Sequence, residues 1–569
     1  MPELSNPSVA DIVVVGSGAA ALVAAIRAHD AGADVLLIER SDKIGGTSAV
    51  SGGGIWIPRN HHMMDLGIED SREDALRYCT ALAMGQVEQA LIEAFVDTAP
   101  EMLAYVEAHT PLQFHAMTAP DYHPELDGAR ESGRSVEPAP FDSRTLGAWR
   151  TSLRAPGAFA FPITRQEAFG DYDAFYRPWN IPQDMVVARM GDNIVTLGQA
   201  LVAGLLAAAL DRGIPIALET RAQGLVRHDG RVAGVRATGP DGGVRTYHAR
   251  KGVILACGGF EWNEHLRRAF LPGPIEAPNS PPVNEGDGLA MGLEIGADVA
   301  NMADIWHFPS IVLPGETYDG QPLSRATGSE RNGPHVIWVN SKGKRFVNEA
   351  ANYNSIGKLL HVMATDGTGF ENLPAWAIFD GQFREKYAFG TTMPQDRDPD
   401  WLIRAESLTD LAEQAGIDPQ GLERTVANWN DYVAAGCDRD FNKGASAFDR
   451  FQGDREHAHP NLGTVAKPPF YALRIYTGAL GTKGGLRIDR RAQVLDMSGQ
   501  PIPGLYAAGN VAASVTGPGY YGRGSTLGPA MTWAYLAATA CAAEAPHDIP
   551  SHMGVGQRTL AHLKSVLGR

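Results

Sequence analysis

Residues 11–40 read DIVVVGSGAAALVAAIRAHDAGADVLLIER, and this stretch decides the fold. Ile12 to Val15 form a continuous run of β-branched apolar residues, which is typical of a buried parallel strand. The turn that follows fits the pattern G-x-G-x-x-A, and residues 34–39 (DVLLIE) form a second apolar run. A strand, a tight turn, a helix and a second strand together predict a dinucleotide-binding unit.

The turn residues suit this chemistry for physical reasons. Gly16 permits the turn, Gly18 lets the backbone approach a pyrophosphate, and Ala21 allows the helix to pack closely on the strand. The helix N-terminus supplies amide donors and the positive end of a dipole. Glu39 closes the second strand, where a carboxylate accepts hydrogen bonds from ribose hydroxyls. The cofactor-binding residues predicted in this unit are Gly16, Ser17, Gly18, Ala19, Ala20, Glu39 and Arg40.

Length, charge and cysteine content narrow the class of protein. A chain of 569 residues is too long for one core, so two or more domains are expected. The net charge of −16, with no basic block, argues against a nucleic-acid partner. Four scattered cysteines show no zinc spacing, so we expect reduced thiols, no metal site and a cytoplasmic protein. The N-terminus lacks a basic signal-peptide region, and no apolar run is long enough to span a membrane.

Three further stretches indicate which dinucleotide is bound. Residues 40–58 (RSDKIGGTSAVSGGGIWIP) resemble the second flavin-contacting loop of the fumarate reductase and succinate dehydrogenase flavoprotein superfamily. Residues 251–263 (KGVILACGGFEWN) and 504–514 (GLYAAGNVAAS) resemble its returning strand and its late strand against the flavin. The resemblance implies FAD, and the lack of a histidine in residues 46–54 implies noncovalent attachment. The implied contacts are Gly46, Thr47, Ser48, Ser51, Gly52, Gly53, Ala256, Gly258, Gly509, Asn510, Thr526 and Leu527.

The same resemblance implies the domain organisation. The expected fold class is α/β, with a discontinuous Rossmann-like FAD-binding domain and an inserted α+β catalytic domain that caps the substrate. Residues 1–290 and 468–569 are expected to form the FAD-binding domain, with an aromatic-rich insertion at about 140–190. Residues 291–467 are expected to form the catalytic domain.

The glycine-rich stretch 514–538 (SVTGPGYYGRGSTLGPAMTWAYLAA) carries two adjacent tyrosines. The dicarboxylate enzymes of the superfamily have a histidine and an arginine here that clamp a substrate carboxylate. Those positions are Thr516 and Tyr520 in this chain. A phenol suits a neutral carbonyl better than a carboxylate. Arg523 lies close by in the sequence and leaves an anionic substrate as the alternative.

Nearly the whole chain resembles the 3-ketosteroid 1-dehydrogenases. The specific stretches are GTSAVSGGGIWIP (46–58), PDYHPE (120–125), RFVNEAANYNS (345–355), GALGTKGGLRID (478–489) and YYGRGSTLGPAMT (520–532). The resemblance implies that the Tyr520 hydroxyl and the Gly524 amide bind the C3 carbonyl, that Tyr353 removes the C2 proton, and that Tyr122 donates to Tyr353. The family's usual proline before Gly524 is replaced by Arg523, which leaves open whether Tyr520 or Tyr521 binds the carbonyl.

The implied reaction is the 1,2-desaturation of a 3-ketosteroid A-ring, with hydride transfer from C1 to flavin N5 and an external electron acceptor such as a quinone. One alternative is a fumarate-reductase-like enoate reductase, which needs the cationic clamp. A second is a 3-ketosteroid 4-dehydrogenase acting at C4–C5. A third is a flavin-bearing carrier without enzymatic activity, against which the placed tyrosines argue, since a carrier needs no base.

Residues 156–181 are the least regular part of the sequence. Seven aromatic residues fall between Phe159 and Trp179, with neither helical nor strand periodicity. One interpretation is a loop packed on the domain surface. The other is an exposed apolar patch near the mouth of the active site that contacts a membrane or forms a dimer contact.

Overall fold

The dinucleotide-binding unit folds as the sequence predicts. In the computed structural model, which describes residues 8–158 and 161–548, β1 (Val9–Val15) leads through a tight turn into α1 (Ala19–Asp30) and then β2 (Val35–Ile38). The two strands pair in parallel, with Val13 opposite Leu36. Both residues are fully buried, which explains the unbroken apolar runs.

Strands from distant parts of the chain complete this sheet. Its main order is β23 (Gln493–Leu495), β24 (Pro501–Ala507), β11 (Val244–Leu255), β1, β2 and β8 (Ile216–Ala217). Every pairing from β24 to β8 is parallel, whereas β23 and the hairpin of β9 (Arg221–His228) and β10 (Arg231–Thr238) are antiparallel. Residues 251–255 of β11 and 504–507 of β24 thus lie in the same sheet as β1. This sheet and its helices confirm the predicted α/β fold class.

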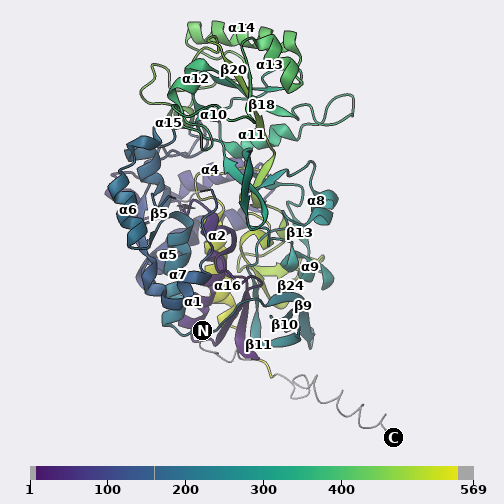
Figure 1. The fold of residues 1–569 in the computed structure, drawn as a ribbon. Helices are drawn as coiled ribbons and strands as arrows, with labels where there is room; N and C mark the ends of the chain where they lie inside the picture. The colour runs from purple at the N-terminus through teal and green to yellow at the C-terminus, as the bar shows by residue number, and fades with distance from the viewer. Residues whose placement is uncertain (1–7, 159–160, 549–569) are drawn as a thin grey trace.

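Alanine-rich helices cover this sheet. Helix α1 packs against α16 (Leu527–Ala542) and α7 (Leu197–Asp211), and α16 also contacts α5 (Gln89–His109). Their small side chains allow close approach of helix to sheet. Figure 1 shows these helices in the half of the molecule that holds the N-terminus.

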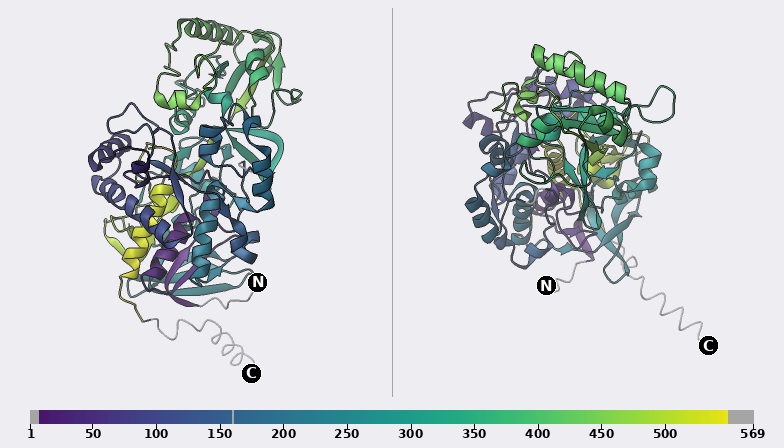
Figure 2. Two further views of the ribbon diagram at one scale, coloured as in Figure 1. Left: turned by 90° about the vertical axis from the view of Figure 1, so that its left-hand side faces the viewer. Right: turned by 45° about the horizontal axis from the view of Figure 1, so that its top comes forward.

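A second antiparallel sheet forms a separate core. Its order is β17 (Val336–Asn340), β18 (Ala375–Asp380), β20 (Phe470–Ile475) and β19 (Ile403–Ala405). Alternate residues of β17 pack on opposite faces: Ile337 and Val339 join the core under α13 (Leu408–Ala415) and α14 (Pro419–Ala435), while Val336 and Trp338 join the other. Figures 1 and 2 show α13 and α14 at the end of the molecule farthest from β9, β10 and β11.

Short elements join the two cores. Strand β21 (Gly478–Thr482) pairs with β12 (Ala277–Pro278) and β14 (Ile305–His307), and β14 contacts α11 (Tyr353–Leu360). A small sheet of β3 (Ile55–Trp56), β5 (Ser135–Pro138) and β4 (Phe114–Ala116) lies beside the first core. The remaining α-helices are α2 (Gly46–Val50), α3 (His62–Asp65), α4 (Arg72–Ala83), α6 (Gln183–Gly191), α8 (Glu264–Phe270), α9 (Asp287–Glu294), α10 (Ser329–Asn332), α12 (Gly381–Lys386) and α15 (Ala447–Gln452). The remaining strands are β6 (Phe141–Asp142), β7 (Ile194–Val195), β13 (Val299–Ala300), β15 (Ser310–Tyr318), β16 (Gln321–Ala326) and β22 (Gly485–Leu486). Across residues 8–158 and 161–548, the structure contains no helix with the length and apolar character to cross a bilayer.

Candidate active site

One continuous cavity connects the dinucleotide-binding turn with the tyrosines singled out in the sequence. Its walls include Gly16 and Glu39 from the first core, and Tyr122, Tyr353 and Tyr520 from segments far apart in the chain. The cavity therefore collects residues from both ends of the chain and from the segment between them.

Every cofactor-binding residue predicted from the sequence except Ala19 lines this cavity. Those residues are Gly16, Ser17, Gly18, Ala20, Glu39, Arg40, Gly46, Thr47, Ser48, Ser51, Gly52, Gly53, Ala256, Gly258, Gly509, Asn510, Thr526 and Leu527. Ala19 is fully buried, and its amide donates a hydrogen bond to Ser48 Oγ at 3.0 Å. Ala19 therefore ties α1 to the glycine-rich loop and does not face the cavity.

The residues at the dinucleotide turn fit FAD. Gly16 has φ +111°, and a Cβ there would lie 2.4 Å from the carbonyl oxygen of Ala256, so only glycine allows this approach. Ser17 Oγ donates to Glu39 Oε2 at 2.6 Å, and the Ser41 amide donates to Oε1 at 2.8 Å. Burial raises the pKa of Glu39, and these hydrogen bonds oppose the rise. A carboxylate on the cavity wall suits a ribose, and the α1 N-terminus suits a pyrophosphate.

Three tyrosines meet in the same cavity and form a chain of hydroxyls. Tyr122 Oη donates to Tyr353 Oη at 3.0 Å, and Tyr353 Oη donates to Tyr520 Oη at 2.9 Å. The rings of Tyr122 and Tyr520 stack with centroids 5.1 Å apart, and Tyr353 stands edge-on to both. The Tyr122–Tyr353 contact is the one that the sequence analysis predicts.

The electrostatic environment keeps these phenols protonated at neutral pH. Burial raises the pKa of Tyr122, Tyr353 and Tyr520 above the usual value of about 10. The neighbouring Tyr520 raises the pKa of Tyr353 further, whereas the hydrogen bond from Tyr122 and the positive charge of Arg523 lower it. Any deprotonation of Tyr353 therefore depends on these two supporting groups.

The loop that carries Tyr520 packs directly on the glycine-rich loop near the N-terminus. Gly524 has φ +95°, and a Cβ there would lie 2.5 Å from the carbonyl oxygen of Gly54. The Trp56 amide donates to the Gly524 carbonyl at 3.1 Å. Tyr521 points the other way: its hydroxyl donates to the carbonyl of Val515, and its ring packs on Trp56 outside the cavity. Tyr520 therefore faces the cavity, and Tyr521 does not.

A buried lysine fixes the segment just before Tyr520. Lys483 Nζ donates to the three carbonyl oxygens of residues 517–519 at 2.7–3.0 Å. Asp304 lies 3.6 Å from the same nitrogen, and Lys358 binds both Asp304 and the carbonyl of Pro518. Burial lowers the pKa of Lys483 to about 7, and Asp304 opposes this shift. All three donors of the ammonium thus hold one turn of backbone.

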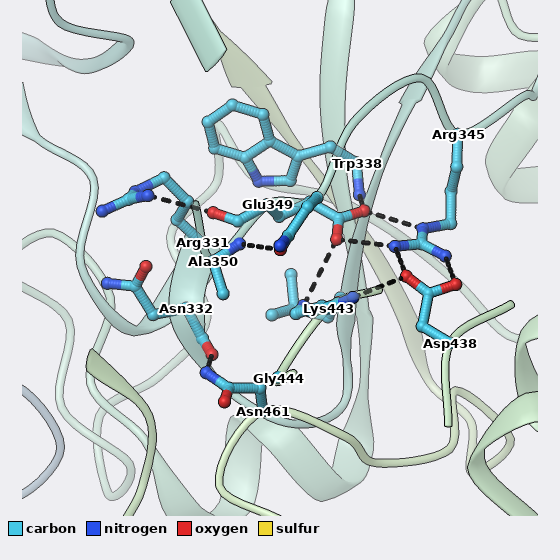
Figure 3. Close-up of polar contacts among 12 residues, drawn as sticks. Arg331, Asn332, Trp338, Arg345, Glu349, Ala350, Asp438, Lys443, Gly444 and Asn461 are labelled. Carbon is cyan, nitrogen blue, oxygen red and sulfur yellow. Dashed lines mark hydrogen bonds and ion pairs between the residues drawn. The ribbon is translucent and has the colours of Figure 1, made fainter. Parts of the chain in front are cut away.

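A second buried network fixes the position of Tyr353. Tyr353 is the first residue of α11, and the Asn352 side chain caps that helix by accepting a hydrogen bond from the Ser355 amide. Upstream, Arg345 binds both Glu349 and Asp438 through paired hydrogen bonds at 2.8–3.0 Å, as Figure 3 shows. These ion pairs are buried, so they hold the NEAANY segment in one conformation.

The aromatic segment 156–181 lies partly inside the molecule. Phe169 and Phe175 line the cavity and stack with centroids 4.4 Å apart. Phe161 and Trp179 are 63% and 51% exposed, and Phe159 lies outside the described residues. The segment therefore forms part of the cavity wall, which neither sequence interpretation anticipated. Its contact with a membrane stays a prediction.

The sequence analysis assigned no role to three cationic residues of the site. Arg165 and Arg331 line the cavity beside the tyrosines, and Lys483 holds the tyrosine loop. Arg165 falls in the segment without periodicity, and Lys483 falls inside a stretch quoted only for its resemblance. Their roles depend on tertiary contacts for which a single sequence carries no signal.

Comparison with known proteins shows the family. The FAD binding domain family matches residues 11–527. The chain is 39% identical to the 4-oxocyclohexanecarboxylate 2-dehydrogenase of Sinomonas cyclohexanicum, over 94% of this chain and 93% of that protein. It is 38% identical to the 3-oxosteroid 1-dehydrogenase of Mycolicibacterium smegmatis, over 94% and 97%.

A solved structure agrees with these matches. The 3-ketosteroid Δ1-dehydrogenase of Sterolibacterium denitrificans, in complex with 1,4-androstadiene-3,17-dione, superimposes with a TM-score of 0.88 at 39% identity. The match covers 94% of this chain and 100% of that chain. The chain therefore belongs to the FAD binding domain family, among the flavin-dependent oxidoreductases that include the 3-oxosteroid 1-dehydrogenases.

Proposed function

We propose that this protein removes two hydrogens from adjacent ring carbons beside a ketone, and that its reaction is the 1,2-desaturation of a 3-ketosteroid. The product of a 3-oxo-4-ene steroid would be the 3-oxo-1,4-diene. The observation that carries the proposal is the hydrogen-bonded trio of Tyr122, Tyr353 and Tyr520 on one cavity with the FAD-binding residues. The named activities of the relatives, which are dehydrogenations of cyclic ketones, support it.

Each tyrosine has a distinct role in this proposal. The Tyr520 hydroxyl and the Gly524 amide bind the C3 carbonyl and stabilise the negative charge that develops on its oxygen. Tyr353 removes the C2 proton, which is acidic because the carbonyl accepts the charge as an enolate. Tyr122 donates to Tyr353 and stabilises its phenolate. FAD, when bound, accepts the hydride that leaves C1 as the C1–C2 double bond forms.

The domain division expected from the sequence suits this reaction. We propose that residues 1–290 and 468–569 hold the flavin and that residues 291–467 cap the substrate and supply Tyr353. The separate hydrophobic core built on β17, β18, β19 and β20 supports an independent capping unit. Because β20 (Phe470–Ile475) completes that sheet, the structure favours a capping unit that continues past residue 467 to the end of β20. An external acceptor, such as a quinone, would reoxidise the flavin.

An enoate reductase is less compatible with the loop. Thr516 stands where the dicarboxylate enzymes have the histidine that binds the substrate carboxylate. It is fully buried and does not line the cavity. Its hydroxyl lies 3.0 Å from the hydroxyl of Ser514. The loop therefore offers no histidine for a dicarboxylate at this place.

The roles are tested by exchange of the C2 hydrogens of 4-androstene-3,17-dione with deuterated solvent, which needs enolisation but no hydride transfer. Tyr353→Phe keeps the ring but removes the base, so exchange and anaerobic flavin reduction should nearly stop while FAD stays bound. Tyr520→Phe removes one donor to the oxyanion, and such losses cost about 10²–10³ in rate.

Tyr521→Phe is the matched control, because Tyr521 is adjacent in sequence but faces away from the cavity. It should retain exchange near the wild-type rate. Wild-type exchange in Tyr353→Phe would remove Tyr353 as the base, and a crippled Tyr521→Phe beside an active Tyr520→Phe would assign the carbonyl to Tyr521.

A further inference from the structure

Four arginines line the cavity that holds the tyrosines: Arg40, Arg165, Arg331 and Arg523. Arg40 forms ion pairs with Glu285 and Asp287, whereas the other three lie on the side of the tyrosines. The guanidinium of Arg523 lies over the ring of Phe169 at 4.5 Å from the centroid, and that of Arg165 lies over the same ring at 5.9 Å. Two of the three positive charges therefore lie close to the same aromatic ring.

The charge of Arg523 has no paired carboxylate in the structure. Its Nη1 is buried and has no hydrogen-bond partner among residues 8–158 and 161–548. Glu137 raises the pKa of both Arg165 and Arg523 through its negative charge, in opposition to the effect of burial. Its oxygens already accept hydrogen bonds from the Arg165 and Gln166 amides at 2.7 and 2.8 Å, and His115 lies 3.1 Å away.

Arg331 is similar. Its Nη1 donates to the backbone carbonyls of Glu349 and Ala351, of which Figure 3 shows the first contact. Its Nε is buried and lacks a partner in the part of the chain that the structure describes. Backbone carbonyls satisfy hydrogen bonds but leave the net charge in place.

Neither Arg331 nor Arg523 forms an ion pair among the described residues, so the cavity next to them is electropositive. Burial and the charge of Arg523 together lower the pKa of Arg165 to about 10. Burial likewise lowers the pKa of Arg331 to about 10 and lowers that of Arg523. Buried charges in proteins are normally paired, because an unpaired one is costly to remove from water. A neutral substrate would leave this cost in place, whereas an anion would offset it.

The position of Arg523 indicates where such an anion would lie. Arg523 directly precedes Gly524, and its charge is among those that lower the pKa of Tyr122 and Tyr353. The guanidinium is thus close to the phenols that face the ketone. A carboxylate at the far end of a long molecule would not reach it.

We propose that Arg523, with Arg165 beside it, binds a carboxylate carried on or next to the ketone-bearing ring, so that the substrate is an anionic cyclic ketone. The inference rests on the proposed dehydrogenation beside a ketone, and it replaces the neutral 3-ketosteroid with an anionic cyclic ketone as the substrate class of that site. A guanidinium binds a carboxylate through two parallel hydrogen bonds, and the unpartnered Nη1 supplies one of the donors.

The test compares substrates that differ in charge alone. The holoenzyme is mixed anaerobically with 4-oxocyclohexanecarboxylate or with its neutral carboxamide, and flavin bleaching is followed. The acid should react with a kcat/KM about 30-fold or more above that of the amide, since loss of one member of a buried charge pair has effects of this size. In Arg523→Met this preference should disappear, and in Arg523→Lys part of it should remain.

Arg455→Met is the matched control. The guanidinium of Arg455 lies over the ring of Phe451, as does that of Arg523. Unlike Arg523, Arg455 is exposed and does not line the cavity. This variant should keep the wild-type preference. A second measurement does not depend on turnover: cyclohexanecarboxylate, but not cyclohexanecarboxamide, should perturb the absorbance of bound flavin, and Arg523→Met should abolish that binding.

The outcomes separate the inference from the proposed function. If amide and acid react equally, or if Arg523→Met slows both by one factor, Arg523 acts on the tyrosines and the inference fails. If a 3-oxo-4-ene steroid with a carboxylated side chain shows the Arg523-dependent preference and the small acid does not react, the placement beside the ketone ring is wrong. If no ketone bleaches the flavin, the proposed function fails, and the titration with cyclohexanecarboxylate still decides whether the anion site exists.

Discussion

Tyr353 shows how a single residue depends on its surroundings. Tyr353 is the first residue of α11. Its hydroxyl accepts a hydrogen bond from Tyr122 and donates one to Tyr520. Burial holds its pKa well above 10, so the phenolate is a minor species at neutral pH. Tyr122 and the charge of Arg523 favour that species, and Tyr520 opposes it. The base is therefore weakly populated, and its population is set by pH.

This environment predicts the pH dependence of the reaction. A raised pKa means that the phenolate fraction grows about tenfold for each pH unit while the pH stays below that pKa. The rate of anaerobic flavin reduction at saturating ketone should therefore rise from pH 6 to pH 10 without a plateau. Stopped-flow measurement across this range checks it. A plateau beginning below pH 8 would show that a group with a lower pKa is the base.

At the scale of elements, the tyrosine loop is held by side chains from other segments. Lys483 follows directly after β21, and its ammonium binds the backbone of residues 517–519. Asp304 precedes β14, and Lys358 lies in α11. Three elements thus converge on one glycine-rich turn, which has few side chains of its own to pack. The loop is ordered by donors that the rest of the fold supplies.

Removing Lys483 should disturb substrate binding more than flavin binding. Lys483→Met removes the Lys483 donor from the three carbonyls of residues 517–519. Among the described residues, the Gly519 carbonyl then has no hydrogen bond, whereas those of residues 517 and 518 keep bonds from Thr516, Lys358 and Asn354. A buried carbonyl left unsatisfied costs about 1–3 kcal/mol. The melting temperature should fall, and exchange of the ketone's α-hydrogens should slow because Tyr520 is no longer held, while FAD content is retained. Lys358→Met, which loses one of the same carbonyl contacts, should have a smaller effect. Equal effects of the two changes would contradict this account.

The sequence predicts local features of the site better than tertiary ones. The turn at Gly16 and the acid at Glu39 were recognisable because their spacing is fixed by one strand–helix–strand unit. Tyr122, Tyr353 and Tyr520 came from a resemblance, since no local rule brings three such distant residues together. The place of Arg165 on the cavity wall was not predicted, because segment 156–181 has no periodicity and its position depends on tertiary contacts.

At the scale of the whole molecule, the cavity lies where residues from the two ends of the chain and the middle segment meet. The residues predicted to bind the flavin come from both terminal segments, so no single segment contains the site. The chain as a whole is acidic, with a net charge of −16, yet the cavity wall carries four arginines, of which Arg165, Arg331 and Arg523 lie on the side of the tyrosines. The cavity next to the tyrosines therefore differs in charge from the protein as a whole.

Because the predicted FAD contacts are spread over both terminal segments, cofactor binding should stabilise the whole protein. The bound flavin is expected to be noncovalent, so acid or heat should release all yellow colour into the supernatant. Flavin-free protein should melt at a lower temperature, and FAD at 100 times its Kd should restore about 2.7 kcal/mol. Flavin that stays on the denatured chain would contradict the prediction, as would an unchanged melting temperature.

The contact between Gly524 and Gly54 has a consequence for thermodynamic linkage. Two backbones meet there without side chains between them, and one belongs to the loop predicted to contact flavin while the other carries the amide proposed to bind the ketone. A shift of either backbone must move the other, because a gap would break the hydrogen bond from Trp56 to Gly524. The binding of cofactor and ketone is therefore coupled. If bound FAD makes the free energy of ketone binding more favourable, bound ketone makes that of FAD binding more favourable by the same amount.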